Sequence, residues 1–283
     1  MIFLVLASLI WSVSFGLIAK VLADLPPAGV AMVRLAIAAL VFLPFVRPVP
    51  WRVKAALVGI GAVQFGLMLL LYMHSFRYLK SHEVALFTVM TPVYVVVIND
   101  CFQRRFRAVN LCAALVAVIG AGAAIRWHGE TPGLSLAGFL LIQLSNICFA
   151  LGQILYREVF ARSAQPLADH HSFFWLYLGG VAVLLPLGLG ETSFVTAMTR
   201  EQWLALLHLA VIASGLSYFL WNSGARKVTA GTLAVMNNLK IPLAVLVSLL
   251  LFREQANVAG LVAGLLLMAV ALCLPRFQKE PSL

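Results

Sequence analysis

The chain has 283 residues, of which 63% are hydrophobic and only 11% are charged, and its mean hydropathy is +1.00. These values exclude an ordinary soluble domain. The net charge of +10 does not indicate nucleic-acid binding, because Lys and Arg gather mostly in short loops between apolar segments, where they orient a membrane protein.

Apolar stretches of about 20 residues, long enough to cross a bilayer, recur along the whole chain. In lipid they must be helices, because a helix satisfies its own backbone hydrogen bonds. The first stretch lacks a basic leader and a clear cleavage site, so we expect a retained helix. The ten predicted spans are residues 2–22, 28–46, 54–76, 83–101, 108–126, 135–156, 171–190, 203–223, 229–251 and 256–274.

The distribution of basic residues predicts the orientation of these spans. With a cytoplasmic N-terminus, the inside loops hold twelve Lys and Arg residues and the outside loops hold six. Cytoplasmic loops carry the excess of positive charge. We therefore predict an all-α integral protein of the bacterial cytoplasmic (inner) membrane, with both termini cytoplasmic.

Two segments half a chain apart nearly match. Gly66 to Pro92 and Gly215 to Pro242 both begin with Gly-Leu, continue through an aromatic residue and a basic break, and carry a proline inside a second apolar run. The offset is 149 residues at the glycines and 150 at the prolines. We predict two repeats, residues 1–128 with spans one to five and residues 134–276 with spans six to ten. Five spans per repeat make the second repeat inverted relative to the first, which places a substrate site between them.

Lys240 is the strongest candidate for that site, because an ionisable group at membrane depth is costly unless it is paired or faces water. Asn237 precedes it by three residues and shares its helical face. Pro242 cannot donate to the carbonyl of Asn238, which bends the helix and frees that oxygen for a ligand or water. A cation beside such a kink suits capture of a carboxylate. Alternatively, Lys240 snorkels to an interface or pairs with an internal carboxylate.

Two further ionisable groups lie in or beside spans. Arg34, in span two, reaches the outer interface, or neutralises Glu83 or another carboxylate between helices, and we assign it a structural or gating role ahead of substrate contact. Glu83 opens span four above Phe87, where it would receive a substrate ammonium group or carry a proton. Alternatively, the dipole of the helix N-terminus favours Glu83 there, and it pairs with Lys80.

Polar and aromatic stripes complete the predicted cavity. Span six carries a polar stripe that must face protein or water. His74 and Tyr78 lie near the outer end of span three, and either line the cavity mouth or pack. The candidate cavity residues are Trp11, Phe15, His74, Tyr78, Glu83, Phe87, Asn146, Gln153, Trp221, Asn237 and Lys240, with Arg34, Pro92 and Pro242 as gating or structural residues. The four cysteines lack paired spacing, and we expect no metal, cofactor or disulfide.

Several sequence features, taken together, resemble those of a known family. These features are Trp11-Ser12 in span one, Arg34 in span two, the prolines of spans four and nine, and Glu254 after span nine. The chain resembles the EamA branch of the drug/metabolite transporter superfamily along its whole length. One departure is Gln103-Arg104-Arg105 in the first half, where the second half has Arg253-Glu254-Gln255.

The resemblance implies an exporter of small metabolites, with amino acids (aromatic ones included) or related carboxylates as substrates, working by alternating access between the repeats. An exporter of lipophilic drugs or cations is an alternative, although Glu83 is the only acidic candidate near a span. An exporter of phosphorylated metabolites would favour more basic groups than Lys240 and Arg34. An intramembrane enzyme lacks a nucleophile with a base in reach. Spans five and ten, rich in small residues, would pack within a monomer or form a homodimer.

Overall fold

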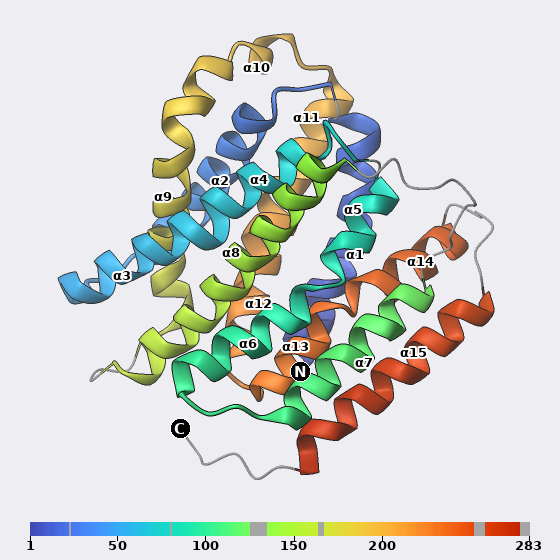
Figure 1. Ribbon diagram of the computed structural model, residues 1–283. Coiled ribbons are helices and arrows are strands. Elements are labelled where there is room, and N and C mark those ends of the chain that lie inside the picture. Colours follow the sequence, from blue (N-terminus) through green and yellow to red (C-terminus); the bar gives the residue numbers. More distant parts are fainter. Residues whose placement is uncertain (23, 80, 125–134, 164–166, 252–257, 278–283) are drawn as a thin grey trace.

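The fold is described from a computed structural model that covers residues 1–22, 24–79, 81–124, 135–163, 167–251 and 258–277. Within these ranges all regular elements are helical (Figure 1). Lys80 and Glu254 lie outside the described residues, as does the segment that joins the two predicted repeats.

The helices follow one another with short connections. In chain order they are α1 (Ile2–Val21), α2 (Pro27–Phe42), η1 (Leu43–Phe45), α3 (Trp51–Gly61), η2 (Ala62–Leu67), α4 (Met68–Ser75), α5 (Ser81–Thr88), α6 (Thr91–Gln103), α7 (Ala108–Ala124), α8 (Leu136–Ala161), α9 (Asp169–Gly188), η3 (Leu189–Glu191), α10 (Phe194–Ala197), α11 (Arg200–Leu207), η4 (His208–Leu216), α12 (Ser217–Ala225), α13 (Ala230–Asn237), α14 (Lys240–Leu251), α15 (Val258–Cys273) and η5 (Leu274–Phe277).

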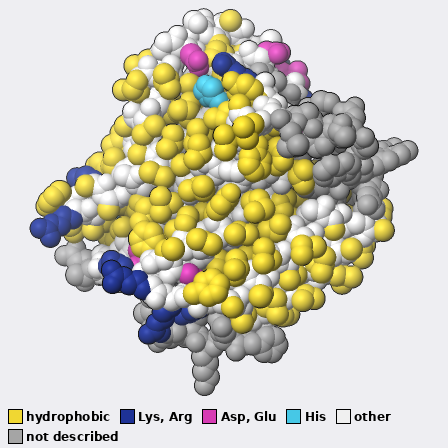
Figure 2. Space-filling model, viewed as in Figure 1, with side chains coloured by type: hydrophobic (Ala, Val, Ile, Leu, Met, Phe, Trp, Pro, Cys, Tyr) yellow, Lys and Arg dark blue, Asp and Glu magenta, His cyan; other side chains and the backbone are white. Residues whose placement is uncertain are grey.

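In the described residues, seven helical segments are long and apolar enough to cross a membrane, and three shorter apolar helices accompany them. The seven are Pro27–Phe45, Trp51–Ser75, Glu83–Gln103, Leu136–Ala161, Asp169–Glu191, Arg200–Ala225 and Ala230–Val247, and the shorter ones are Ile2–Ser14, Ala108–Ala123 and Val258–Cys273. Hydrophobic side chains cover the middle of the face in Figure 2, and charged side chains gather towards its two ends. The all-helical membrane architecture is therefore confirmed, whereas the ten spans and the cytoplasmic termini remain predictions.

The two matching sequence segments have the same local structure. Each begins with a π-helical stretch, η2 or η4, that contains the matching glycine, Gly66 or Gly215. Each then has a helix that ends just before the proline and a second helix that carries it. The first pair is α5 and α6, and the second pair is α13 and α14 (Figure 1). Thr91 and Lys240 each begin the second helix of a pair, 149 residues apart.

Proline explains both interruptions, because it has no backbone N–H to donate to the residue four positions earlier. The Thr88 carbonyl, which Pro92 cannot reach, accepts a bond of 2.6 Å from the Thr91 hydroxyl. The carbonyl of Asn238, which we predicted to be open to a ligand, instead accepts a bond of 3.0 Å from the Ile241 N–H. The prediction was wrong because the chain tightens into a three-residue turn at this point.

The two interruptions meet inside the molecule. The amide nitrogen of Asn238, between α13 and α14, donates to the carbonyl of Val89, between α5 and α6, over 2.9 Å. It also donates to the Ala117 carbonyl of α7 over 3.3 Å. Asn238 lies four residues before Pro242, and Val89 lies three residues before Pro92. The broken helices of the two halves are thus joined within one residue of corresponding positions.

Glycine allows the closest helix contacts. A Cβ on Gly61 of α3 would lie 1.8 Å from the Leu176 carbonyl oxygen of α9, and one on Gly179 would lie 1.9 Å from that of Val58. The two backbones therefore touch directly, and no larger residue fits. On another side of the molecule α7 and α15 lie side by side (Figure 1), with Gly120 against the backbone of the other helix.

Candidate functional site

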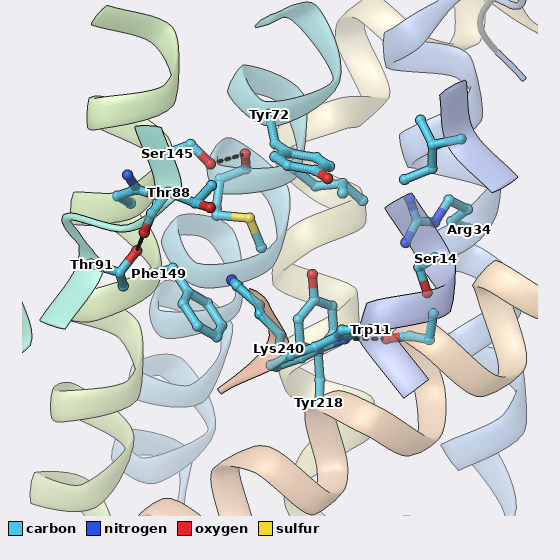
Figure 3. A pocket seen from close by; sticks show the side chains of 15 residues that line it. Trp11, Ser14, Arg34, Tyr72, Thr88, Thr91, Ser145, Phe149, Tyr218 and Lys240 are labelled. Atoms are coloured by element: carbon cyan, nitrogen blue, oxygen red, sulfur yellow. Dashed lines mark hydrogen bonds between the residues drawn. The ribbon is translucent and has the colours of Figure 1, made fainter. Parts of the chain in front are cut away.

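A cavity lies where the broken helices meet α1, α2, α4, α8 and α12 (Figure 3). It encloses about 650 Å³ of atom-free space, part of it open to solvent. The lining residues are Trp11, Ser14, Ile18, Arg34, Met68, Leu69, Tyr72, Thr88, Thr91, Ser145, Asn146, Phe149, Ala213, Tyr218 and Lys240.

Lys240 projects into this cavity from the first turn of α14 (Figure 3). Its Nζ lies 5.8 Å from the centre of the Trp11 ring and 5.9 Å from that of Phe149. Aromatic faces attract a cation but do not neutralise its charge. Among the described residues, Lys240 forms no ion pair with a carboxylate.

Arg34 reaches the same cavity from α2 and is only 4% exposed. Its Nη2 donates to the Ser214 hydroxyl over 3.1 Å, and its Nη1 lies 4.0 Å from the Met73 sulfur. In the described part of the chain its Nε has no partner, and no carboxylate pairs with the guanidinium, Glu83 included. Arg34 and Lys240, which we call the cation pair, thus bring to one cavity two positive charges that no described carboxylate compensates.

Two tyrosine hydroxyls lie between these cations in the view of Figure 3. Neither the Tyr72 hydroxyl nor the Tyr218 hydroxyl hydrogen-bonds to another described residue, and both tyrosines line the cavity. Each hydroxyl can therefore donate a hydrogen bond to a ligand. Tyr72 and Phe149 were not predicted from the sequence, although Tyr72 occupies the position of Trp221 in the two matching segments.

The structure brings three of the predicted cavity residues to this cavity: Trp11, Asn146 and Lys240. The Trp11 ring nitrogen donates to the Ala213 carbonyl of η4 over 2.9 Å, which holds its ring at the edge of the cavity. Arg34, predicted as a gating or structural residue, lines the cavity as well. The side chain of Phe15 lies outside the described residues.

Three other predicted residues form a buried cluster behind Trp11. The Trp221 ring lies 5.1 Å from the Trp11 ring and is 1% exposed. Its Nε1 donates to Gln153 Oε1 over 3.0 Å, and Asn237 Nδ2 donates to the same oxygen over 3.3 Å. Because these polar atoms satisfy one another, the cluster supports the cavity without lining it.

The remaining predicted residues also lie away from the lining. The Phe87 ring packs edge-on against Phe139 at 5.1 Å, and Glu83 is buried in the first turn of α5. His74 Nδ1 lies 3.0 Å from the Leu70 carbonyl. Tyr78 is 52% exposed at the surface. Pro92 and Pro242 are buried near the starts of α6 and α14, where they shape the two interruptions.

Comparison with known proteins identifies the class. The EamA-like transporter family matches residues 1–125 and 136–275, so the chain belongs to this family. It is an integral protein of the inner membrane and a transporter of small metabolites.

Several relatives match nearly the whole chain. It is 38% identical to the biotin transporter of Salmonella typhimurium, over 99% of this chain and 94% of that protein. It is 40% identical to the probable biotin transporter of Pseudomonas aeruginosa, over 98% of each chain. The pseudopaline exporter CntI of the same species is 24% identical over 97% of this chain and 95% of that protein. These names support a small-metabolite transporter but do not support the predicted amino acid substrate.

A solved crystal structure also aligns with this chain, with a TM-score of 0.70 over 96% of this chain and 95% of the other. The two sequences are only 17% identical, so this likeness concerns the fold alone.

Proposed function

We propose that this protein carries biotin, or a closely related monocarboxylate, across the membrane through the cavity described above. The observation that carries the proposal is the cation pair, which has no counter-ion among the described residues. The names of the relatives at 38–40% identity supply the substrate class.

The charges of the cavity favour an anion. Buried cations without a counter-ion are costly in a membrane, and a carboxylate between Lys240 and Arg34 would offset part of that cost. The hydroxyls of Tyr72 and Tyr218 would add two donors to its oxygens. Charge-assisted hydrogen bonds of this kind are stronger than neutral ones.

The same charges argue against the other substrate classes. None of the described lining residues is Asp or Glu, so an amino acid would leave its ammonium group without a carboxylate partner. A cationic drug would meet like charges at Lys240 and Arg34.

Aromatic and aliphatic side chains provide the surface for the body of the ligand. The rings of Phe149 and Tyr218 lie 5.8 Å and 5.4 Å from that of Trp11, all beside Lys240 (Figure 3). Met68 and Leu69 line the cavity from α4. A carboxylate on an apolar chain would place its charge at the cation pair and its chain against these rings.

Access would alternate by rocking of the two halves about the joined interruptions, with Asn238 against Val89. The proposal also keeps net export, the direction predicted from the sequence. A vectorial transport assay tests this direction.

Counterflow of labelled biotin into liposomes that hold the purified protein tests the proposal. We expect saturable counterflow that excess biotin suppresses and that phenylalanine, a sugar phosphate or a lipophilic cation leaves unchanged. Arg34→Gln should weaken biotin competition about tenfold or more, because one charge-assisted contact is lost. Arg162→Gln removes the same charge from an exposed ion pair with Glu158 and should change nothing. Counterflow of phenylalanine without counterflow of biotin would refute the proposal.

A further inference from the structure

Four small polar side chains from α5, α6 and α8 line the cavity, and three of them, Thr88, Thr91 and Ser145, lie on the side across from Arg34 in Figure 3. We call this set the acceptor wall, and it consists of Thr88, Thr91, Ser145 and Asn146. All four residues line the cavity, and all four donate their hydrogens to other protein groups.

The three hydroxyls of the acceptor wall bond to backbone carbonyls. Thr88 Oγ1 donates to the Ala85 carbonyl over 2.8 Å, and Thr91 Oγ1 donates to the Thr88 carbonyl over 2.6 Å. Ser145 Oγ donates across to the Met68 carbonyl of α4 over 3.0 Å. A hydroxyl has one hydrogen, so each of these oxygens has only lone pairs left for a ligand.

The side-chain amide of Asn146 is likewise oriented with its hydrogens bonded to protein groups. Its amide nitrogen donates to the Phe87 carbonyl over 3.0 Å and to Gln143 Oε1 over 3.4 Å, which occupies both amide hydrogens. Gln143 is itself oriented, because it donates to the Phe87 carbonyl over 3.2 Å and accepts from the Tyr94 hydroxyl over 2.9 Å. Only Asn146 Oδ1, an acceptor, remains for the cavity.

The helix interruption makes this arrangement possible. The Phe87 carbonyl belongs to the last turn of α5, where carbonyls lack the helical N–H partners of a continuous helix. Hydroxyl bonds to a carbonyl three or four residues earlier are common within helices and are explained locally. The bonds from Ser145 to Met68 and from Asn146 to Phe87 instead join α8 to other helices, so local helix geometry does not explain the orientation of these two side chains.

The cation pair and the acceptor wall are therefore chemically opposite. Ammonium and guanidinium groups have donors and no acceptors, whereas the acceptor wall has acceptors and no free hydrogens. A ligand that fits both sets of groups has an anionic end and, at its other end, neutral N–H donors.

We infer that the acceptor wall selects, among carboxylates, those whose opposite end carries N–H donors, such as the cyclic urea of biotin. This inference rests on the proposed function. A carboxylate without such donors would cover these acceptors and leave them unpaired, which lowers its affinity.

Competition against labelled biotin counterflow tests the inference with two probes. Desthiobiotin keeps the carboxylate and the cyclic urea, whereas lipoate keeps a carboxylate on a similar chain and has no N–H donor. With the unaltered protein, desthiobiotin should compete within about threefold of biotin, and lipoate about tenfold or more weakly. Equal competition by lipoate would overturn the inference, whereas absence of counterflow for every carboxylate would instead refute the proposed function.

A variant of Asn146 tests whether the acceptor wall causes the preference for biotin over lipoate. Asn146→Leu keeps the branching and the number of heavy atoms of the side chain and leaves the Phe87 carbonyl bonded to Gln143, so it should weaken biotin about tenfold and leave lipoate unchanged. Asn99→Leu makes the same substitution at a buried α6 residue away from the lining and should keep the wild-type ratio of the two affinities. An equal loss for biotin and lipoate in Asn146→Leu would show a packing role and overturn the inference. If that variant does not fold, the comparison with the unaltered protein decides.

Discussion

Substitution of Lys240 by methionine separates binding from folding. Methionine keeps most of the length and the apolar contacts of the side chain with Trp11 and Phe149, and it removes the charge. If the charge serves a ligand, its removal should weaken ligand binding and stabilise the ligand-free protein. If the charge serves packing, its removal should destabilise the protein.

The expected magnitudes follow from the surroundings of Nζ. A lysine at membrane depth costs about 3 kcal/mol, and two cation–aromatic contacts at these distances return about 1–2 kcal/mol. In the described residues no carboxylate offsets the remainder. Lys240→Met should therefore stabilise the empty protein by about 1–2 kcal/mol and raise its Tm by about 2–6 °C. Loss of one charge-assisted bond, worth about 1.5–3 kcal/mol, should weaken biotin binding roughly 10- to 100-fold.

Thermal unfolding in detergent without ligand and biotin counterflow in liposomes measure the two effects on one preparation. Lys54→Met is the matched control, because Lys54 Nζ lies 4.4 Å from the Trp175 ring but Lys54 does not line the cavity. It should leave biotin affinity unchanged and should not raise the Tm. A lower Tm for Lys240→Met with unchanged affinity would refute the assignment of Lys240 to the ligand.

Two further predictions concern the scaffold. Gly61→Ala would place a Cβ 1.8 Å from the Leu176 carbonyl oxygen and should prevent recovery of folded protein, whereas Gly59→Ala, two residues earlier with open space around it, should be neutral or stabilising by up to about 1 kcal/mol. Monodispersity and Tm in detergent check both, and two equally stable variants would contradict the close packing of α3 on α9. Asn238→Ala should lower stability by about 1–3 kcal/mol, because it leaves two buried carbonyls short of a donor. Ser223→Ala, at a buried hydroxyl without a partner among the described residues, should not lower it in the same unfolding assay, and a matching loss would contradict the join between the two halves.

Much of the architecture was predictable because membrane helices are local structures. Each span satisfies its own backbone, so hydropathy alone locates it. The interruptions near Pro92 and Pro242 were predictable for the same reason, since a missing N–H acts within one helical turn. The bonding at those interruptions was not. The Thr88 carbonyl pairs with a side chain and that of Asn238 with the backbone, although the two segments match in sequence.

The polar stripe of span six shows what helical periodicity does not predict. Gln143, Asn146 and Gln153 share a helical face, and the sequence predicts one cavity wall. In the structure Asn146 lines the cavity, Gln143 bonds to Tyr94 beside it, and Gln153 bonds to Trp221 behind it. Helical spacing specifies the face of a residue, but the depth of the cavity along a helix of 26 residues depends on its neighbours.

By itself the sequence determined that the chain lies in a membrane, that two interrupted segments correspond, and that Lys240 and Arg34 carry charge at membrane depth. Only the tertiary structure decided that both cations face one cavity without a described counter-ion. It also decided that Thr88, Thr91, Ser145 and Asn146 turn acceptors towards that cavity. The reason is that the partners of these groups, or their absence, depend on contacts between helices far apart in the chain, and a polar group stays open to a ligand only where no such contact satisfies it.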